Sequence, residues 1–180
     1  MFRRNIISKL EAWKQDQKHK PLILRGARQV GKTTVVNEFG SQFDNYLYFN
    51  LERNENAKLF EMEIPLDDLV NMLYASVGKV KKEGTTLVFI DEIQNSPKTI
   101  ALLRYFYEQR PDLYVIAAGS LLENLVDVKV SFPVGRVQYL ALRPCSFSEF
   151  LGAIGKNNLL AVLSQKAPDQ IGRASCRERV

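Results

Sequence analysis

A glycine-bounded segment near the start of the chain, residues 26–33, combines the residue types that bind phosphate groups. It reads Gly-Ala-Arg-Gln-Val-Gly-Lys-Thr and matches the P-loop pattern G-x-x-x-x-G-K-[ST] at every fixed position. The glycines permit a tight turn with positive φ and a close approach of backbone N–H groups to phosphate. Lys32 supplies a mobile charge for the β- and γ-phosphates, and Thr33 supplies a hydroxyl ligand for Mg²⁺. The segment therefore predicts a site for a nucleotide, ATP in the first place, with Mg²⁺.

The residues predicted to contact the nucleotide extend one position beyond this pattern. An apolar strand before the loop and an amphipathic helix after it argue against a chance match, because together they hold the loop and a helix N-terminus against phosphate. Arg28 and Gln29 can contact either phosphate or a neighbouring subunit, and the sequence leaves both possibilities open. The predicted nucleotide-binding residues are Gly26, Ala27, Arg28, Gln29, Val30, Gly31, Lys32, Thr33 and Thr34.

Two adjacent carboxylates end an apolar segment, residues 86–92, which reads Thr-Leu-Val-Phe-Ile-Asp-Glu. A carboxylate at the tip of a strand beside a P-loop can hold Mg²⁺ through water, and we assign this role to Asp91. The next carboxylate can orient and deprotonate the attacking water, so Glu92 is the predicted general base. A helix cap or a solvated strand end is the alternative, which the complete P-loop earlier in the chain makes the weaker interpretation.

Two further residues are candidates for contacts with the reacting phosphate. Ser120 follows an apolar segment, and strand ends in parallel sheets face the ligand crevice; the alternative is a serine in a turn. Arg136 can neutralise charge in the transition state as an arginine finger or phosphate sensor, in its own chain or between subunits; the alternative is a surface arginine. The predicted catalytic residues are Lys32, Glu92, Ser120 and Arg136, and the predicted metal ligands are Thr33 and Asp91.

The elements that must position these residues alternate between short apolar segments and amphipathic ones. Such alternation predicts an α/β fold, a parallel sheet with helices on both faces. Ser96-Pro97 predicts a capped helix start, and Ser146-x-x-Glu149 predicts a capping box. We expect strands over residues 22–24, 46–51, 86–90, 113–118 and 137–142, and helices over 4–15, 33–40 and 66–77 and after Ser96 and Ser146.

Composition narrows the class of protein further. Two cysteines and a single His19 do not suffice for a disulfide framework, a zinc cluster or Ser-His catalysis, and His19 lies in a Lys-rich stretch where we expect it to be solvated. No apolar run approaches the roughly 20 residues that span a bilayer, so a cytoplasmic protein without a membrane partner is expected. The net charge is +5, and two of these charges come from residues 172–180. A nucleic-acid partner therefore ranks low without being excluded.

Taken together, these motifs resemble the AAA-type ATPase domain of bacterial and archaeal "ATP-binding proteins" in which a second domain, DUF4143, usually follows. The matching stretches are residues 22–34, 88–94, 118–122, 135–137 and 143–151. Asp-Glu-Ile-Gln at 91–94 and Ser-Phe-Ser-Glu-Phe at 146–150 point to this family in particular, since the P-loop is shared by many.

The resemblance implies more than the residues do by themselves. It implies a P-loop NTPase sheet ordered 5-1-4-3-2, a catalytic Glu92, a sensor-like Ser120 and a family-typical position for Arg136. We expect an ATPase domain with an N-terminal helix over residues 1–155, the start of a helical region over 156–171 and a non-native tail over 172–180. The C-terminal domain of the family would be absent from this chain. A homo-oligomer follows if Arg136 acts between subunits.

Other functions remain as alternatives. A GTPase would need an Asn-Lys-x-Asp guanine reader and an Asp-x-x-Gly switch, and the sequence contains neither. A small-molecule kinase fits less well, because a carboxylate beside Asp91 suits activation of water better than transfer to a bound acceptor. The leading hypothesis is an ATPase that acts as a switch or motor for an attached domain. A module that binds nucleotide without turnover, or a DNA-associated ATPase, is the alternative.

Overall fold

The structure is a computed structural model of the 180-residue chain, and it describes residues 4–120, 133 and 135–165. The chain divides into two compact units, Ile6–Pro144 and a second unit made of Met1–Asn5 with Cys145–Val180. The predicted tail, 172–180, and residues 166–171 of the predicted helical region lie outside the described residues. Each unit is described by itself below.

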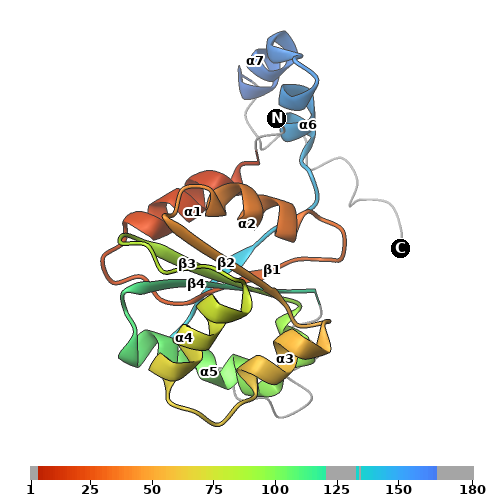
Figure 1. The fold of residues 1–180 in the computed structure, drawn as a ribbon. Helices are drawn as coiled ribbons and strands as arrows, with labels where there is room; N and C mark the ends of the chain where they lie inside the picture. The colour runs from red at the N-terminus through yellow and green to blue at the C-terminus, as the bar shows by residue number, and fades with distance from the viewer. Residues whose placement is uncertain (1–3, 121–132, 134, 166–180) are drawn as a thin grey trace, which may run out of the picture. The chain divides into compact units, whose positions relative to one another are not determined.

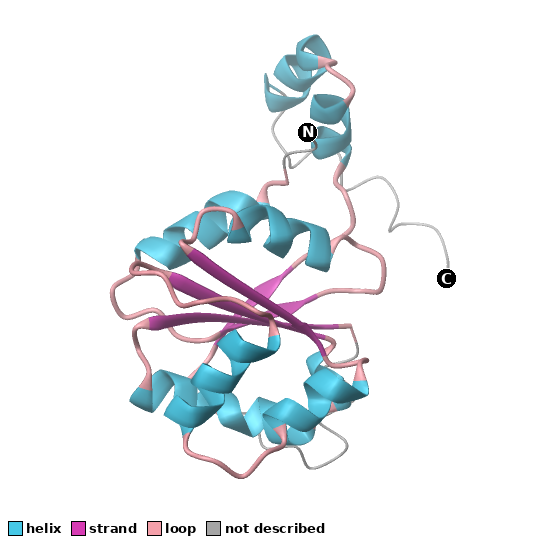
Figure 2. Cartoon of the chain, in the orientation of Figure 1, coloured by secondary structure: helices cyan, strands magenta, loops and turns pink. Residues whose placement is uncertain are grey.

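The larger unit is built on a five-stranded parallel sheet (Figures 1 and 2). Its order, read from one edge, is β5-β1-β4-β3-β2, which confirms the predicted fold class and the order 5-1-4-3-2. The pairs β1–β4, β1–β5, β2–β3 and β3–β4 are all parallel. The strands are β1 (Leu22–Arg25), β2 (Asn45–Asn50), β3 (Thr86–Asp91), β4 (Leu113–Gly119) and β5 (Gln138–Ala141).

Helices cover both faces of this sheet. The helices α1 (Ile6–Gln15) and α2 (Lys32–Gly40) lie on one face, and α3 (Asn54–Phe60), α4 (Leu66–Ser76) and α5 (Pro97–Gln109) lie on the other (Figure 1). A short 3-10 turn, η1 (Ile93–Asn95), follows β3. Helix α3 was not predicted from the sequence, because its seven residues include a single buried side chain, Phe60, and hence show no helical period.

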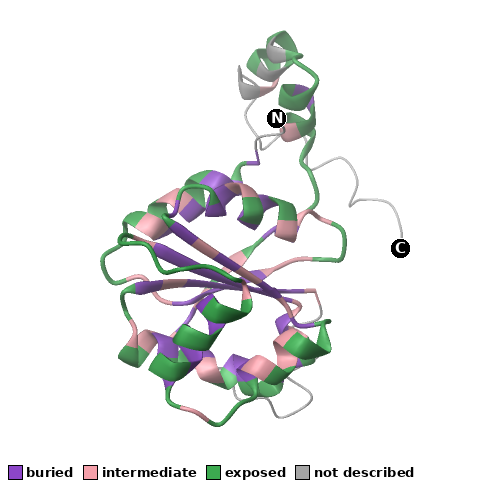
Figure 3. Cartoon of the chain, in the orientation of Figure 1, coloured by how far each residue is buried: buried purple, intermediate pink, exposed green. Residues whose placement is uncertain are grey.

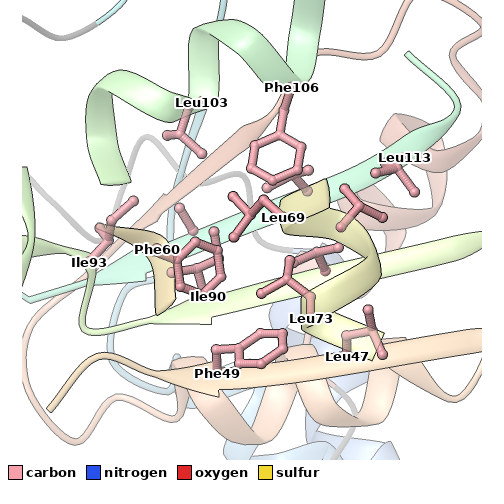
Figure 4. Packing of buried hydrophobic residues seen from close by; sticks show 14 of the residues in the cluster. Leu47, Phe49, Phe60, Leu69, Leu73, Ile90, Ile93, Leu103, Phe106 and Leu113 are labelled. Carbon is pink, nitrogen blue, oxygen red and sulfur yellow. The ribbon is translucent and has the colours of Figure 1, made fainter. Parts of the chain in front are cut away.

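Two hydrophobic clusters, one on each face, hold the layers together. The cluster beneath α3, α4 and α5 includes Phe49, Leu73 and Phe106, each at most 1% exposed (Figure 4). The cluster beneath α1 and α2 includes Trp13 and Phe39. Figure 3 shows buried residues running along the strands between the two helical layers. All six residues of β3 are buried, as expected for a central strand covered on both faces.

Local sequence accounts for several of the boundaries. Ser96 caps α5 by accepting a hydrogen bond from the Thr99 backbone N–H, and Pro97 occupies the first turn. Helix α2 ends at Gly40, as predicted, and a Cβ there would lie 2.7 Å from the ring of Tyr46. The glycine thus lets the end of α2 pack directly on β2.

The smaller unit is helical. Helix α6 (Phe147–Ala153) begins with the predicted capping box, in which the Ser146 hydroxyl accepts from the Glu149 N–H and the Glu149 carboxylate accepts from the Ser146 N–H. The Arg4 guanidinium donates to the same carboxylate over 3.2 Å. Helix α7 (Asn157–Gln165) follows. The two compact units meet at Pro144–Cys145, whereas the sequence predicted the end of the ATPase domain at residue 155, and that prediction stays a prediction.

His19 does not lie free in solvent, which corrects the prediction made from its lysine-rich neighbours. Its ring is half-buried and stacks on Tyr114 at 4.0 Å between centroids, with Trp13 at its edge. Local sequence could not reveal this contact, because Tyr114 belongs to β4 and lies nearly a hundred residues further along the chain. Among the described residues, no helix is long and apolar enough to cross a membrane.

Candidate functional site

The predicted phosphate-binding loop lies at the carboxyl edge of the sheet. It connects the end of β1, which lies between β4 and β5, to the start of α2. The register places Arg25 opposite Gly119 on β4 and Asn50 opposite Asp91 on β3. Arg25 also lies opposite Ala141 on β5, and Ile90 lies opposite Ala117 on β4. The strands therefore end close to one level, and the residues that follow them can converge on one ligand.

The loop contains two residues with positive φ. Gly31, at φ 90°, directly precedes α2, and its carbonyl accepts the helical bond from the Val35 N–H over 3.0 Å. Gln29, at φ 62°, is not a glycine, and a left-handed conformation there costs about 1–3 kcal/mol. Positive φ was predicted for the glycines alone, because the P-loop pattern leaves the position of Gln29 unspecified.

Gly26 is required for a different reason from the one predicted. Its φ is not in the left-handed region, yet a Cβ at this position would lie 2.4 Å from the backbone oxygen of Leu142. Leu142 follows β5 and donates its own N–H to the Arg25 carbonyl over 2.7 Å. The glycine therefore lets the start of the loop pass against the chain that leaves β5.

The side chain of Lys32 folds back onto the phosphate-binding loop. It is 6% exposed, and its ammonium donates to the backbone oxygens of Gly26 and Ala27 over 2.9 and 2.8 Å. These acceptors are neutral, and hydrogen bonds to charged phosphate oxygens are about twice as strong. The Lys32 ammonium can therefore exchange its hydrogen bonds to these loop carbonyls for stronger ones to a phosphate group.

Thr33 and Asp91 form the link between the loop and β3. The Thr33 hydroxyl donates to Asp91 Oδ2 over 2.6 Å, and the Glu92 N–H donates to Oδ1 over 3.0 Å. Burial nevertheless raises the pKa of Asp91, with the Glu92 charge adding to the rise, and the two hydrogen bonds oppose it. Tyr48 Oη lies 3.5 Å from Oδ2. A buried carboxylate beside a threonine hydroxyl offers the hard oxygen donors that Mg²⁺ prefers.

Glu92 takes an unusual backbone conformation. Its φ and ψ are 54° and 44°, in the left-handed region that side-chain-bearing residues rarely adopt. The chain turns sharply here into η1, whose Ile93 is fully buried. The Glu92 carboxylate is half-exposed and accepts a hydrogen bond from the Gln94 side-chain amide. Such strain is typical of residues whose side-chain direction matters to function.

A cavity of about 470 Å³ brings most of the predicted site residues together. Val30 does not contribute a side chain to it and packs instead against the cluster beneath α1 and α2. Glu52, which follows β2, lines the cavity and was not predicted. Its lining residues are Arg28, Gln29, Gly31, Lys32, Thr33, Thr34, Glu52 and Glu92.

Ser120 lies at the same edge of the sheet. It follows Gly119, which pairs with Arg25, so Ser120 is level with the first residue of the loop. Its hydroxyl oxygen is buried, and it has no hydrogen-bond partner within the described part of the chain. A buried hydroxyl without a partner is uncommon, and it places an available donor beside the phosphate-binding loop.

Arg136 lies at the amino ends of the strands, opposite the end that carries the phosphate-binding loop. It precedes β5, whose first residue, Gln138, donates to the Pro21 carbonyl at the amino end of β1. Four residues of β5 separate it from the level of the loop, roughly 13 Å at 3.3 Å per residue. Its guanidinium donates to Glu108 Oε1 over 2.6 Å. The structure therefore does not bring Arg136 to the loop of its own chain, and this position is compatible with the role between subunits or with the alternative, a surface arginine.

Three residues at the site were missed by sequence reasoning. Tyr48 and Glu52 belong to or follow β2, a strand that carries no motif, and only the pairing of β2 with β3 brings them beside Asp91 and Glu92. Gln94 lies two residues after Glu92 in the segment used for the family resemblance, but it was not given a role. A polar residue so close to a predicted general base was the available signal.

Comparisons with known proteins bear on the fold and on the family of the chain. A chain in the structure of Drosophila ORC bound to DNA has a similar fold, with a TM-score of 0.55 and 14% sequence identity over 88% of this chain and 48% of that chain. The present chain thus spans about half the length of that one, and at this identity the likeness concerns the fold alone. No curated protein sequence matches the chain. The family model described as an AAA domain matches residues 18–151, most of the chain. The chain therefore belongs to the AAA domain family.

Proposed function

We propose that this chain binds ATP together with Mg²⁺ and hydrolyses the β–γ phosphoanhydride bond. The observation that supports this most directly is the group of Lys32, the Thr33–Asp91 pair and Glu92 at one edge of the sheet. A cation, a carboxylate–hydroxyl pair and a second carboxylate are the parts that phosphoryl transfer to water needs.

The residues present fit a bound magnesium nucleotide. Asp91 is a buried carboxylate that burial makes unfavourable as an ion, and a bound cation would relieve this. When bound, Mg²⁺ would supply positive charge that offsets the negative charge of the phosphate groups. Thr33 and Asp91 would hold it, and Lys32 would exchange its bonds to loop carbonyls for bonds to phosphate.

Glu92 is proposed as the general base. Its carboxylate lines the same cavity as Lys32 and Thr33, and its backbone conformation directs it out of the sheet. A carboxylate so placed can orient a water molecule and accept its proton. Ser120, with its unpartnered hydroxyl level with the loop, is proposed to donate to the reacting phosphate or to the attacking water.

Arg136 is proposed to act only on a neighbouring subunit. It is 43% exposed at the far edge of the sheet, and in its own chain it is paired with Glu108. A homo-oligomer that exchanges this pairing for a phosphate would make hydrolysis depend on assembly. The proposed output is a switch or motor movement of an attached C-terminal domain of the DUF4143 type, which the resemblance of residues 143–151 to that family supports.

Binding of ATP and GTP with Mg²⁺, measured by calorimetry, tests the first half of the proposal. We expect ATP to bind in preference to GTP, because the sequence lacks a guanine-reading motif, and Lys32→Ala to lose the binding. Lys20→Ala is the matched control: Lys20 also donates to a backbone oxygen, that of Gly135 over 2.7 Å, but at the opposite edge of the sheet. Equal losses in the two variants would contradict the proposed site.

Turnover tests the second half. We expect Glu92→Gln to retain ATP binding and to lower phosphate release by at least about a hundredfold, the contribution typical of a general base. Binding without release in the wild-type chain would favour the alternative function, a nucleotide-binding module. Unchanged release in Glu92→Gln would show that another group is the base.

A further inference from the structure

Gln94 is the residue next to the proposed site whose side chain has no assigned role. It lies in η1, the tight turn that follows Glu92, and the Asn95 N–H closes this turn on the Glu92 carbonyl over 3.0 Å. Ile93, between the two, is fully buried and fixes the turn to the core beneath α5. The backbone at this point thus returns the side chain of Gln94 toward that of Glu92.

The two ends of the Gln94 amide are treated unequally. Nε2 donates to Glu92 Oε2, a bond strengthened by the charge of the carboxylate. Oε1 is buried and has no partner among the described residues. A flipped amide would place Oε1 against the carboxylate, where two acceptors repel. The orientation of the amide is therefore determined by Glu92. The hydrogen bond to the carboxylate offsets the cost of leaving Oε1 without a partner among the described residues.

The consequence for Glu92 is that one of its two carboxylate oxygens is already engaged. A glutamate has three rotatable side-chain bonds, and a base with freely rotating oxygens spends little time in a productive orientation. The strained backbone sets the direction in which the side chain leaves the chain, and the Gln94 amide sets the rotation at its end. The remaining oxygen is then the one left to accept a proton from water.

We propose that Gln94 is a positioning residue that orients the Glu92 carboxylate for proton abstraction. This inference rests on the proposed function, because it gives Glu92 the role of general base. The hydrogen bond of the Gln94 side chain goes to Glu92, and Gln94 is not among the residues that line the cavity. Its effect should therefore appear in kcat and leave the affinity for ATP unchanged.

Gln94→Met separates positioning from a structural role. Methionine has a similar length, removes the donor to Glu92 and also removes the buried, unpaired Oε1. We expect kcat to fall at least about tenfold, the KM for ATP to stay within about twofold, and the thermal midpoint of unfolding to be equal or higher. A residue that only supported the fold would instead lower the thermal midpoint. Gln94→Leu serves as the second variant, with the same expectations.

The chain offers a matched control in Gln138. It is also half-buried, and its Oε1 is also buried without a partner in the described part of the chain, but it lies on β5 at the sheet edge. Gln138→Met should have a similar effect on the thermal midpoint and none on kcat. A change in kcat of equal size in both variants would overturn the inference.

A double-mutant cycle with Glu92 sharpens the test. In the Glu92→Gln background, Gln94→Met should lower the residual hydrolysis no further, because the group that it positions is already gone. Independent, multiplicative losses would overturn the inference. Gln94→Met with unchanged or raised kcat would overturn it as well, and a raised value would mean that the bond restrains the base.

A readout that needs no turnover keeps this inference distinguishable from the proposed function. In a ¹⁵N-labelled chain, the side-chain amide signals of Gln94 are identified by their absence from Gln94→Met. We expect one Nε2–H to be protected from solvent exchange and to lose this protection in Glu92→Ala, while the Gln138 signals stay unchanged. Protection that persists in Glu92→Ala would overturn the inference, whereas a wild-type chain with this signature and no hydrolysis would overturn only the proposed function.

Discussion

A threonine donates to an aspartate at both ends of the sheet's strands, the carboxyl edge and the amino edge, but the pKa of the aspartate is shifted in opposite directions. At the carboxyl edge, Thr33 donates to Asp91 over 2.6 Å, and burial raises the pKa of Asp91. At the amino edge, the Thr85 hydroxyl donates to Asp44 over 2.9 Å, and its backbone N–H donates over 2.7 Å. These bonds hold the pKa of Asp44 below its usual value. The folded chain thus favours the ionised form of Asp44 and disfavours that of Asp91.

This difference supports the proposal that a ligand binds at the carboxyl edge. At the amino edge, charges are already satisfied: Glu108 accepts from both Arg104 and Arg136, and Asp44 accepts from Thr85. At the carboxyl edge, the Ser120 hydroxyl has no partner among the described residues, and Lys32 binds only neutral carbonyls. Polar groups left in such states are retained where function needs them.

The largest expected effect comes from replacing the threonine of each pair. Thr33→Val removes the hydroxyl from the proposed Mg²⁺ site, and we expect the Mg²⁺-dependent gain in ATP affinity and the rate of hydrolysis to fall by about a hundredfold. Thr85→Val removes the equivalent hydroxyl at the other edge, and neither quantity should change. Calorimetry with and without Mg²⁺ measures the first and phosphate release the second. Similar losses in both variants would mean that the threonine supports the fold alone.

The glycines beside the two pairs provide the next test. A Cβ at Gly26 would lie 2.4 Å from the Leu142 backbone oxygen, and one at Gly84 would lie 2.2 Å from Asp44 Oδ2. Both alanine variants should lower the free energy of unfolding in denaturant titrations, by about 1–3 kcal/mol for overpacking. Only Gly26→Ala should also weaken ATP binding, because the rigid backbone of Leu142 forces the loop itself to move. Retained ATP affinity in a folded Gly26→Ala would contradict this account.

Substituting the aspartates should change stability in opposite directions. Because the pKa of Asp91 is raised in the folded chain, its ionisation opposes folding, and this opposition develops as the pH rises above 3.8. Asp91→Asn should therefore raise the thermal midpoint at pH 7 in EDTA. The lowered pKa of Asp44 favours folding above pH 3.8, and this contribution is lost as the pH falls through its folded value.

Asp44→Asn should therefore lower the midpoint at pH 7, and both differences from the wild type should shrink as the pH approaches 3. Thermal unfolding between pH 3 and 7 measures them. Changes of the same sign in the two variants would remove the electrostatic distinction between the edges.

The smallest expected effect concerns Ser120. Replacing a buried hydroxyl that has no partner by alanine should leave the free energy of unfolding unchanged or raise it by up to about 1 kcal/mol. If the hydroxyl contacts the reacting phosphate, Ser120→Ala should lower kcat several-fold at the same time. Denaturant titration and phosphate release on one preparation measure both. A loss of stability with unchanged kcat would assign Ser120 to the turn alone.

Motif spacing was enough to predict the chemical parts of the proposed site. The P-loop pattern and the carboxylate pair of 91–92 are local in the sequence, and they lie where the parallel sheet predicts, on one cavity or immediately beneath it. The strand order 5-1-4-3-2 came with the family resemblance and is confirmed. Caps such as Ser96 were predictable because a cap is formed by residues a few positions apart.

Only the tertiary structure decided which distant residues share an environment. Arg136 was grouped with the site by its motif, but the direction of β5 places it at the other edge, since a parallel strand begins where its neighbour begins. The need for glycine at position 26 comes from the backbone of Leu142, and the partial burial of His19 comes from stacking on Tyr114. The hydrogen bond from Gln94 to Glu92 depends on a buried turn. Burial and pairing across the sheet are properties of the packed chain. They determine the direction in which the pKa of each aspartate is shifted, which the sequence alone does not reveal.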